Sequence, residues 1–253
     1  MIKKCLLFIF CLLFPCVGYA GSITTSGITA QAILDRVRYD LNEIIAPSGG
    51  TGYWKDPELI YYMDEAVREI VYQTRCLETG VSNIIVIADA RTYTIADTIS
   101  GVSWLDIEKV EYDIGLSGNT TDYPQIFDLD RVPFSNLRYG KEKEFALPKS
   151  YSVWNNTLYI FPIPRDDPAS GVTMSGNTIY LYAITKPSGV TNSSSKIETP
   201  AFFDFAIRDY VKAKAYEKSP YTETRAPFYF EKFMKRIKEY QDKIMKRNVA
   251  TAP

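Results

Sequence analysis

The chain has 253 residues, enough for one large domain or two small ones with a substantial buried core. Its formal net charge of −1 gives no overall basic excess of the kind that nucleic-acid-binding domains carry. Because histidine is absent, the chain lacks the commonest metal ligand and general base, and any Ser–His or Cys–His nucleophile pair. The 19 tyrosines, 13 phenylalanines and 3 tryptophans are typical of either an interface or a β-rich core.

Residues 1–20 have the layout of a secretory signal peptide. Lys3 and Lys4 precede a short apolar run, and small residues stand before a cleavage point after Ala20. Export is the favoured prediction from composition, and removal of the two lysines would change the net charge from −1 to −3. The alternative is an apolar N-terminal arm that is retained and buried in a partner.

Residues 21–80 are predicted to form a helical hairpin after a flexible, Ser/Thr/Gly-rich lead-in. The first helix begins near Thr29, and the Pro/Gly-rich residues 47–52 separate it from the second. Asp56 is expected to cap the second helix, with Pro57 in the first helical position. Helical spacing predicts one apolar face on each helix: Ile33, Leu34, Val37, Leu41, Ile44 and Ile45, then Leu59, Ile60, Met63, Ala66, Val67, Ile70 and Val71. Each helix needs the other to cover this face.

Residues 81–198 are predicted to form a β-rich insertion, as a small antiparallel sheet or sandwich. The expected strands are 83–87 and 91–95, paired as a hairpin; 102–114; 151–154 and 157–161, paired across Asn155-Asn156; and 177–184. Residues 128–137 are expected to form a short helix or turn.

Residues 199–247 are predicted to return to helix, which leaves 248–253 as a tail. Thr199 is expected to cap the first of these helices, with Pro200 in the first helical position. The last helix has an apolar stripe of Phe230, Phe233, Met234, Ile237, Tyr240, Gln241 and Ile244. The predicted fold class is therefore α+β: a helical bundle formed by the N- and C-terminal helices, with an inserted antiparallel β-rich region.

The outer face of the last helix has seven basic residues against three acidic ones, a net charge of +4. The basic residues are Lys232, Lys235, Arg236, Lys238, Lys243, Lys246 and Arg247. Such a face is usually a solvated helix surface. The functional interpretation is contact with an acidic partner surface or with a phosphate backbone.

No group of residues predicts a catalytic site, a cofactor site or a metal site. The carboxylates of Asp128 and Asp130, and those of Asp166 and Asp167, are explained better by solvated turns than by acid/base pairs. Cys76 is the one cysteine outside the first twenty residues, and it is expected to be a small apolar residue near a helix end. The chain is predicted not to be an enzyme and to have no small-molecule substrate.

Three groups of motifs follow one another along the chain. The first comprises Ile33-Leu34-Asp35-Arg36-Val37-Arg38, Tyr53-Trp54-Lys55-Asp56-Pro57-Glu58-Leu59 and Asp64-Glu65-Ala66-Val67-Arg68-Glu69-Ile70. The second is Leu147-Pro148, Trp154 and Leu158-Tyr159-Ile160-Phe161-Pro162-Ile163-Pro164, and the third is Ile207-Arg208-Asp209-Tyr210-Val211-Lys212-Ala213-Lys214-Ala215-Tyr216-Glu217. In their order and spacing, over residues 29–247, they resemble the head-to-tail adaptor proteins of tailed bacteriophages.

The resemblance implies a structural virion protein that is assembled in the host cytoplasm. Identical subunits would form a ring, commonly twelve-fold in that family, which docks beneath the portal protein and contacts tail or nozzle proteins. The basic residues of the last helix would then face an acidic portal surface or make non-specific contact with the exiting DNA. Amphipathic helices near both ends and an aromatic-rich composition also suit a closed ring with heterologous interfaces.

The leader favours a second hypothesis, an exported periplasmic or envelope-associated binding protein of a bacterium. The leader agrees with an adaptor if residues 1–20 are a buried arm, or if translation starts downstream of Met1.

Overall fold

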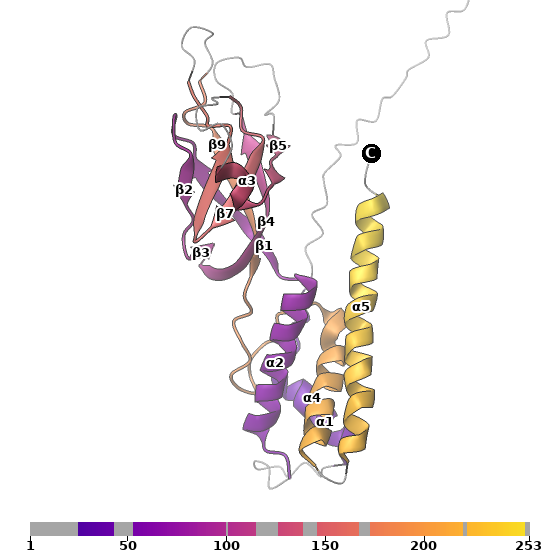
Figure 1. The fold of residues 1–253 in the computed structure, drawn as a ribbon. Coiled ribbons are helices and arrows are strands. Elements are labelled where there is room, and N and C mark those ends of the chain that lie inside the picture. The colour runs from indigo at the N-terminus through magenta and orange to yellow at the C-terminus, as the bar shows by residue number, and fades with distance from the viewer. Residues whose placement is uncertain are drawn as a thin grey trace, which may run out of the picture.

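The computed structural model describes residues 25–42, 53–99, 101–114, 126–138, 146–166, 173–219 and 222–250. The predicted leader, the loop at 47–52 and residues 251–253 of the predicted tail lie outside the described residues, as do the side chains of 78–81 and 244–250. The chain forms a helical part and a β-rich part, which lie at opposite ends of the molecule (Figure 1). The predicted α+β class is confirmed.

The N-terminal helices are α1 (Ala30–Asp40) and α2 (Asp56–Thr74). Thr29 caps α1, and its hydroxyl oxygen accepts a hydrogen bond from the Ala32 amide at 3.4 Å. The predicted cap of α2 is wrong, because Lys55 holds the N-cap position and makes no side-chain cap hydrogen bond. Asp56 is the first helical residue, and its carboxylate instead accepts a hydrogen bond from Nε of the buried Arg38 at 3.1 Å. A buried guanidinium requires such a partner.

The C-terminal helices are η1 (Ala201–Phe203), α4 (Asp204–Lys218), η2 (Glu223–Arg225) and α5 (Ala226–Ala250). The predicted cap at Thr199 is wrong, since the chain enters α4 through the 3₁₀ turn η1, with Pro200 at its N-cap. Thr199 is buried, and its carbonyl oxygen accepts a hydrogen bond from the Ser26 amide at 3.0 Å. Extended pairing with the segment before α1 therefore holds Thr199 outside the helix.

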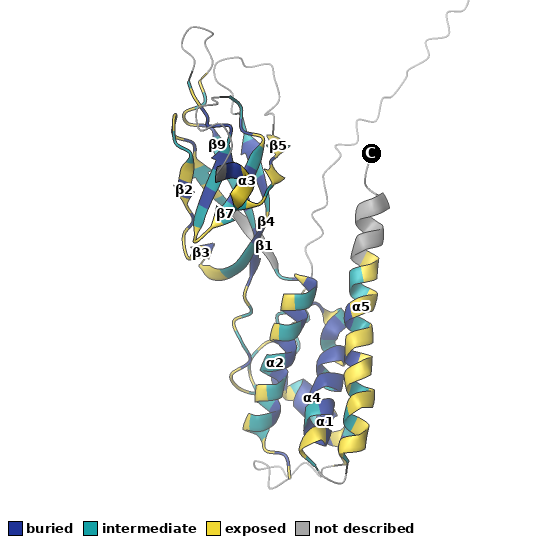
Figure 2. Cartoon of the chain, viewed as in Figure 1, coloured by how far each residue is buried: buried dark blue, intermediate teal, exposed yellow. Residues whose placement is uncertain are grey.

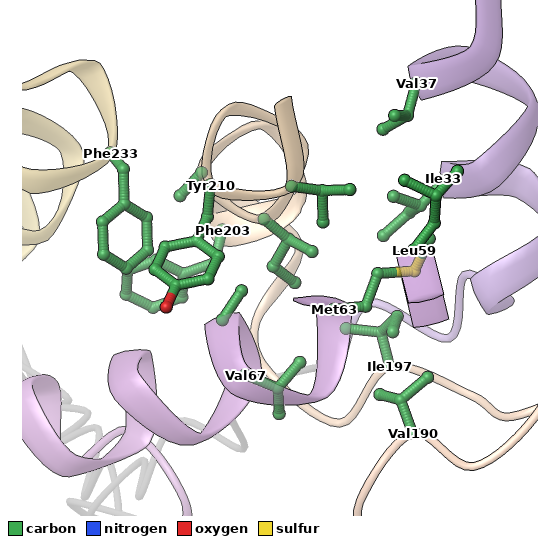
Figure 3. Close-up of a cluster of buried hydrophobic side chains, with 14 of the residues drawn as sticks. Ile33, Val37, Leu59, Met63, Val67, Val190, Ile197, Phe203, Tyr210 and Phe233 are labelled. Carbon is green, nitrogen blue, oxygen red and sulfur yellow. The ribbon is translucent and has the colours of Figure 1, made fainter. Parts of the chain in front are cut away.

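Side chains from α1, α2, α4 and α5 share one hydrophobic cluster (Figures 2 and 3). Its members include Ile33, Val37, Leu59, Met63, Val67, Phe203, Ile207, Tyr210, Phe233 and Ile237, with Val190 and Ile197 from the segment that precedes η1. All predicted apolar positions of α2 are buried except the half-buried Ile60, while Ile44 and Ile45 lie outside the described residues. Each fully buried large apolar side chain stabilises the fold by about 1.5–3 kcal/mol. The helical part thus needs both ends of the chain.

The β-rich part contains two sheets around a second hydrophobic cluster. A five-stranded sheet has the order β1-β9-β4-β3, with β5 paired to β4. Its strands are β1 (Glu78–Ile85), β9 (Thr178–Thr185), β4 (Val102–Asp113), β3 (Thr98–Ile99) and β5 (Ile126–Asp128). The other sheet has the order β2-β8-β7-β6, with β2 (Thr92–Thr94), β8 (Thr157–Phe161), β7 (Ser150–Trp154) and β6 (Asp130–Arg131). Its β6–β7 pair is parallel, whereas the other pairs are antiparallel.

The hairpin predicted across Asn155-Asn156 is confirmed as β7–β8, with φ angles of 48° and 55° at the two turn residues. The strands predicted near 102–114 and 177–184 are also confirmed, as β4 and β9. Residues 128–137, expected to be a helix or turn, include β6 and most of the short helix α3 (Phe134–Arg138).

The hairpin predicted between 83–87 and 91–95 is wrong, because β1 pairs with β9 and β2 pairs with β8. After β1 the chain turns at Asp89, whose φ is 61° and whose amide donates to the Pro164 carbonyl oxygen at 2.8 Å. This turn directs the two runs into different sheets, where β9 and β8, from the second half of the insertion, pair with them.

Two connections join the β-rich part to the helical part. At the end of α2, Arg75 adopts a left-handed conformation with φ 52°, and its guanidinium contacts Glu108 at 2.7 Å and Asp106 at 3.3 Å on β4. In the returning segment, the Val190 amide donates to Oδ1 of Asp64 on α2 at 2.8 Å. Both connections therefore anchor on α2.

Candidate interaction surfaces

Two of the acidic side chains singled out in the β-rich part, those of Asp128 and Asp166, have structural partners. Asp128 pairs with Lys109 at 2.9 Å, and Asp166 accepts hydrogen bonds from the amides of Met174 and Ser175 at 2.6 and 2.8 Å. Asp167 lies outside the described residues, and Cys76 is buried and not in a disulfide. Across the described ranges, no three acidic or cysteine side chains gather as a metal would require, and no helix is both long enough and apolar enough to cross a bilayer. The remaining candidate sites are surfaces of the helical part.

Helix α5 contacts the rest of the helical part along one narrow face. Phe233 and Ile237 are fully buried, and the ring of Tyr240 packs on Phe203 with 4.7 Å between centroids. Phe230 and Met234, which the apolar spacing placed in the same stripe, remain 45% and 36% exposed. Most of α5 is therefore surface, as the exposed colouring in Figure 2 shows.

The predicted basic residues of α5 divide into two groups. Lys232, Arg236 and Lys243 lie over aromatic rings of α5, α4 and η1, respectively. The distance to the ring centroid is 4.2 Å from Lys232 to Phe228 and 4.6 Å from Lys243 to Phe202. The other two described members, Lys235 and Lys238, line a surface hollow of about 500 Å³ that also includes Gln73 of α2. The side chains of Lys246 and Arg247 lie outside the described residues. The structure therefore brings three of the seven residues together, rather than forming one basic face.

The first group belongs to a surface between α1 and α5 that we call the basic–aromatic face. It consists of Phe205, Arg208, Phe228, Lys232, Arg236 and Lys243. Phe205 is 52% exposed and Phe228 is 53% exposed. The guanidinium groups of Arg208 and Arg236 both lie over the Phe205 ring, each at 5.3 Å from its centroid. Cations over exposed rings give this face a positive charge and an apolar surface together.

Ion pairs beneath this face hold it to the helical core. Asp40 of α1 contacts Arg208 at 2.9 Å and Lys212 at 3.1 Å, while Asp209 contacts Lys212 at 3.1 Å and Arg236 at 3.5 Å. Burial alone would raise the pKa of Asp40, but the hydrogen bonds from Arg208 and Lys212 outweigh it, and this pKa lies below its ordinary value of 3.8. These contacts fix α1, α4 and α5 relative to one another.

An acidic surface lies on the other side of α5, over α4 and toward α2, and we call it the acidic groove. Its carboxylates are Glu65 and Glu69 of α2, Glu217 of α4 and Glu223 of η2. Part of the groove is a hollow of about 660 Å³, lined by Ala213, Lys214, Glu217, Glu223, Thr224, Ala226, Pro227 and Phe230. Burial raises the pKa of Tyr210 to about 12, together with the negative charges of Glu65, Glu69 and Glu217. The hydroxyl of Tyr210 points toward α2 in Figure 3.

Sequence reasoning did not single out either surface. Phe205 and Phe228 do not belong to the apolar stripes of their helices. Large apolar residues outside such a stripe are the signal that could have indicated an exposed aromatic face. The acidic groove takes its carboxylates from three separate elements, so no local pattern indicates it.

Comparison with known protein families gives a match over most of the chain. The model of a protein family described as SU10 adaptor protein matches residues 28–253. No curated protein sequence matches the chain. The matched range contains all helices and strands of the described residues, including both the basic–aromatic face and the acidic groove.

Proposed function

Because the chain belongs to the SU10 adaptor protein family, we propose that it is a structural virion subunit whose copies form a ring beneath the portal and connect the portal to the tail. The family match over residues 28–253 is the observation that carries the proposal. It agrees with the resemblance to phage head-to-tail adaptors drawn from the sequence motifs. An adaptor of this kind is a virion component whose partners are portal and tail proteins.

The architecture of the helical part supports a ring. Helices from both ends of the chain share one core, so each subunit brings a preformed helical unit to the assembly. A ring of identical copies requires two different faces on each subunit, because each copy meets its neighbours through unlike surfaces. The basic–aromatic face and the acidic groove are two such surfaces.

Lys235 and Lys238 are the best placed of the predicted portal contacts. Both are exposed on α5, and neither forms an ion pair with any described carboxylate. Arg236 is less suited, because it already contacts Asp209 and the Phe205 ring. An acidic portal surface would attract the two lysines, and the backbone of DNA passing through the ring would attract them without sequence preference.

Negative-stain imaging of the purified chain mixed with portal rings tests the proposal. We expect rings of this chain to be stacked on the portal, and the variant Lys235→Glu with Lys238→Glu to lose docking while its circular dichroism is unchanged. The matched control, Lys149→Glu with Lys186→Glu, changes two exposed lysines of the β-rich part and should still dock. Unchanged docking of the α5 variant would refute the role of these lysines, and the absence of wild-type rings on the portal would refute the connector.

The signal-peptide-like leader favours the export alternative. N-terminal sequencing separates the two functions. A mature start at Gly21 in periplasmic material supports an exported protein, whereas an intact Met1 in purified phage particles supports the connector.

A further inference from the structure

We propose that the basic–aromatic face of one copy binds the acidic groove of the next copy around the ring. The inference rests on the proposed function, since it requires that copies of the chain meet side by side. It adds the two surfaces through which they meet and the chemistry that pairs them.

The two surfaces lie on opposite sides of α5, with α4 beneath both. On one side, Arg236 of α5 reaches Asp209, and Arg208 reaches Asp40 of α1. On the other side, Tyr210 of α4 lies beside Glu65 of α2. Figure 1 shows α2 and α5 on opposite sides of α4. A contact between unlike faces leaves the groove of one copy and the face of the other free, so further copies can add in the same way, and the assembly closes into a ring when the rotation between copies allows it.

The charges of the two surfaces are complementary. Lys232 and Lys243 contact aromatic rings, and neither is ion-paired to a carboxylate within the described part of the chain. In the acidic groove, Lys214 pairs with Glu217 at 3.4 Å, which leaves the other three carboxylates in excess. Within one copy, each surface therefore has charge that an adjacent copy can neutralise. Such complementarity aligns an interface and excludes other registers.

Both surfaces also carry apolar side chains suited to burial. Phe205 and Phe228, each about half exposed, stand on one side, and Phe230, 45% exposed, stands on the other. Aromatic residues and arginine are enriched at protein interfaces.

Charge reversal on each surface, followed by combination, tests the pairing. The face variant is Lys232→Glu with Lys243→Glu, and the groove variant is Glu217→Lys with Glu223→Lys. The measurement is the concentration of full-length chain at which half is in rings, by mass photometry, with portal rings present if wild type requires them. We expect each variant to need at least about tenfold more protein than wild type. The four-site variant, in which both surfaces are reversed, should return to within about threefold of wild type.

The control is Lys149→Glu with Lys186→Glu, which should assemble like wild type. Circular dichroism establishes that each variant is folded. If a folded two-site variant fails to assemble into rings, the four-site variant shows whether the loss comes from the charge pairing. Rings that tolerate both reversals, or a four-site variant that stays unassembled although folded, would overturn the pairing. A face variant that loses DNA or portal binding while its rings persist would overturn it as well. In each of those cases wild-type rings remain, so the proposed function stands; failure of wild type to form rings at all contradicts the function itself.

Discussion

Trp54 donates its indole N–H to the backbone carbonyl oxygen of Ala215 at 3.0 Å, across 161 positions of the chain. Trp54 precedes α2, Ala215 is near the end of α4, and both are buried. The hydrogen bond joins the N-terminal and C-terminal segments at the end of the helical part away from the β-rich part (Figure 1). The two ends of the chain are therefore expected to fold as one cooperative unit.

Trp54→Phe tests that expectation. The substitution leaves the buried Ala215 carbonyl without its donor, so we expect the free energy of unfolding to fall by about 1–3 kcal/mol. The measurement is equilibrium unfolding in urea. Trp104→Phe is the matched control, because Trp104 donates to the Ala96 carbonyl at 2.8 Å in an exposed position where water replaces the lost donor. Equal losses for the two variants would contradict the role assigned to Trp54.

Asp40→Asn tests the ion pairs beneath the basic–aromatic face. Since the pKa of Asp40 is lowered by Arg208 and Lys212, its contribution to stability is present above its ordinary pKa of 3.8 and is lost as pH falls through the lower folded-state value. We expect the variant to be about 1–2 kcal/mol less stable than wild type at pH 7. This difference should shrink as pH falls below 3.8.

Thermal unfolding from pH 7 to pH 3 measures this trend. Asp35→Asn, which removes a carboxylate bonded to Gln31 on the same helix, is the control and should cost less. A difference between wild type and Asp40→Asn that grows in acid would contradict the predicted sign.

Gly189→Ala tests the close approach of the returning segment to α2. Gly189 has φ +92°, and an added Cβ would lie 3.1 Å from Oδ1 of Asp64, the atom that accepts the Val190 amide. We expect a loss of about 2 kcal/mol or more, from backbone strain together with the contact. Gly176→Ala has a similar φ of +88° with nothing within 4 Å, so it isolates the strain. Denaturant unfolding should show the larger loss for Gly189→Ala, and equal losses would refute the contact.

Two substitutions of Arg75 separate backbone strain from ion pairing at the junction with β4. Arg75 is left-handed at φ 52°, and its guanidinium, which contacts Glu108 and Asp106, is half exposed. Arg75→Ala removes the ion pairs and keeps the strain, whereas Arg75→Gly removes both. We expect the glycine variant to be about 1 kcal/mol more stable than the alanine variant, by calorimetry. The opposite order would mean that the left-handed conformation contributes no strain.

Local patterns predicted the elements whose causes are local. Helix α1 begins next to Thr29 as expected, and the Asn155-Asn156 pair closes its hairpin because asparagine tolerates the positive φ that the turn requires. Predictions failed where a distant residue decides the outcome. Asp56 turns to Arg38 instead of capping α2, and β1 pairs with β9, which no neighbouring residue indicates.

The candidate surfaces follow the same division. Sequence identified the basic residues of α5, but their separation into two groups depends on where α4 and α2 pack against that helix. Phe230 and Met234 match the helical spacing of buried residues yet remain exposed, because α2 does not cover that side of α5. Periodicity predicts which residues share a face, whereas packing determines whether another element covers it.

Single-particle cryo-electron microscopy of the neck of intact phage particles would show whether this chain assembles as a ring between portal and tail. We expect a closed ring immediately beneath the portal, into which the described helices and strands fit. At each contact between neighbouring copies, the basic–aromatic face of one copy should pack against the acidic groove of the next, with helix α5 at the interface. A neck resolved at side-chain level in which another protein occupies the layer beneath the portal, and this chain is absent, would refute the assembly.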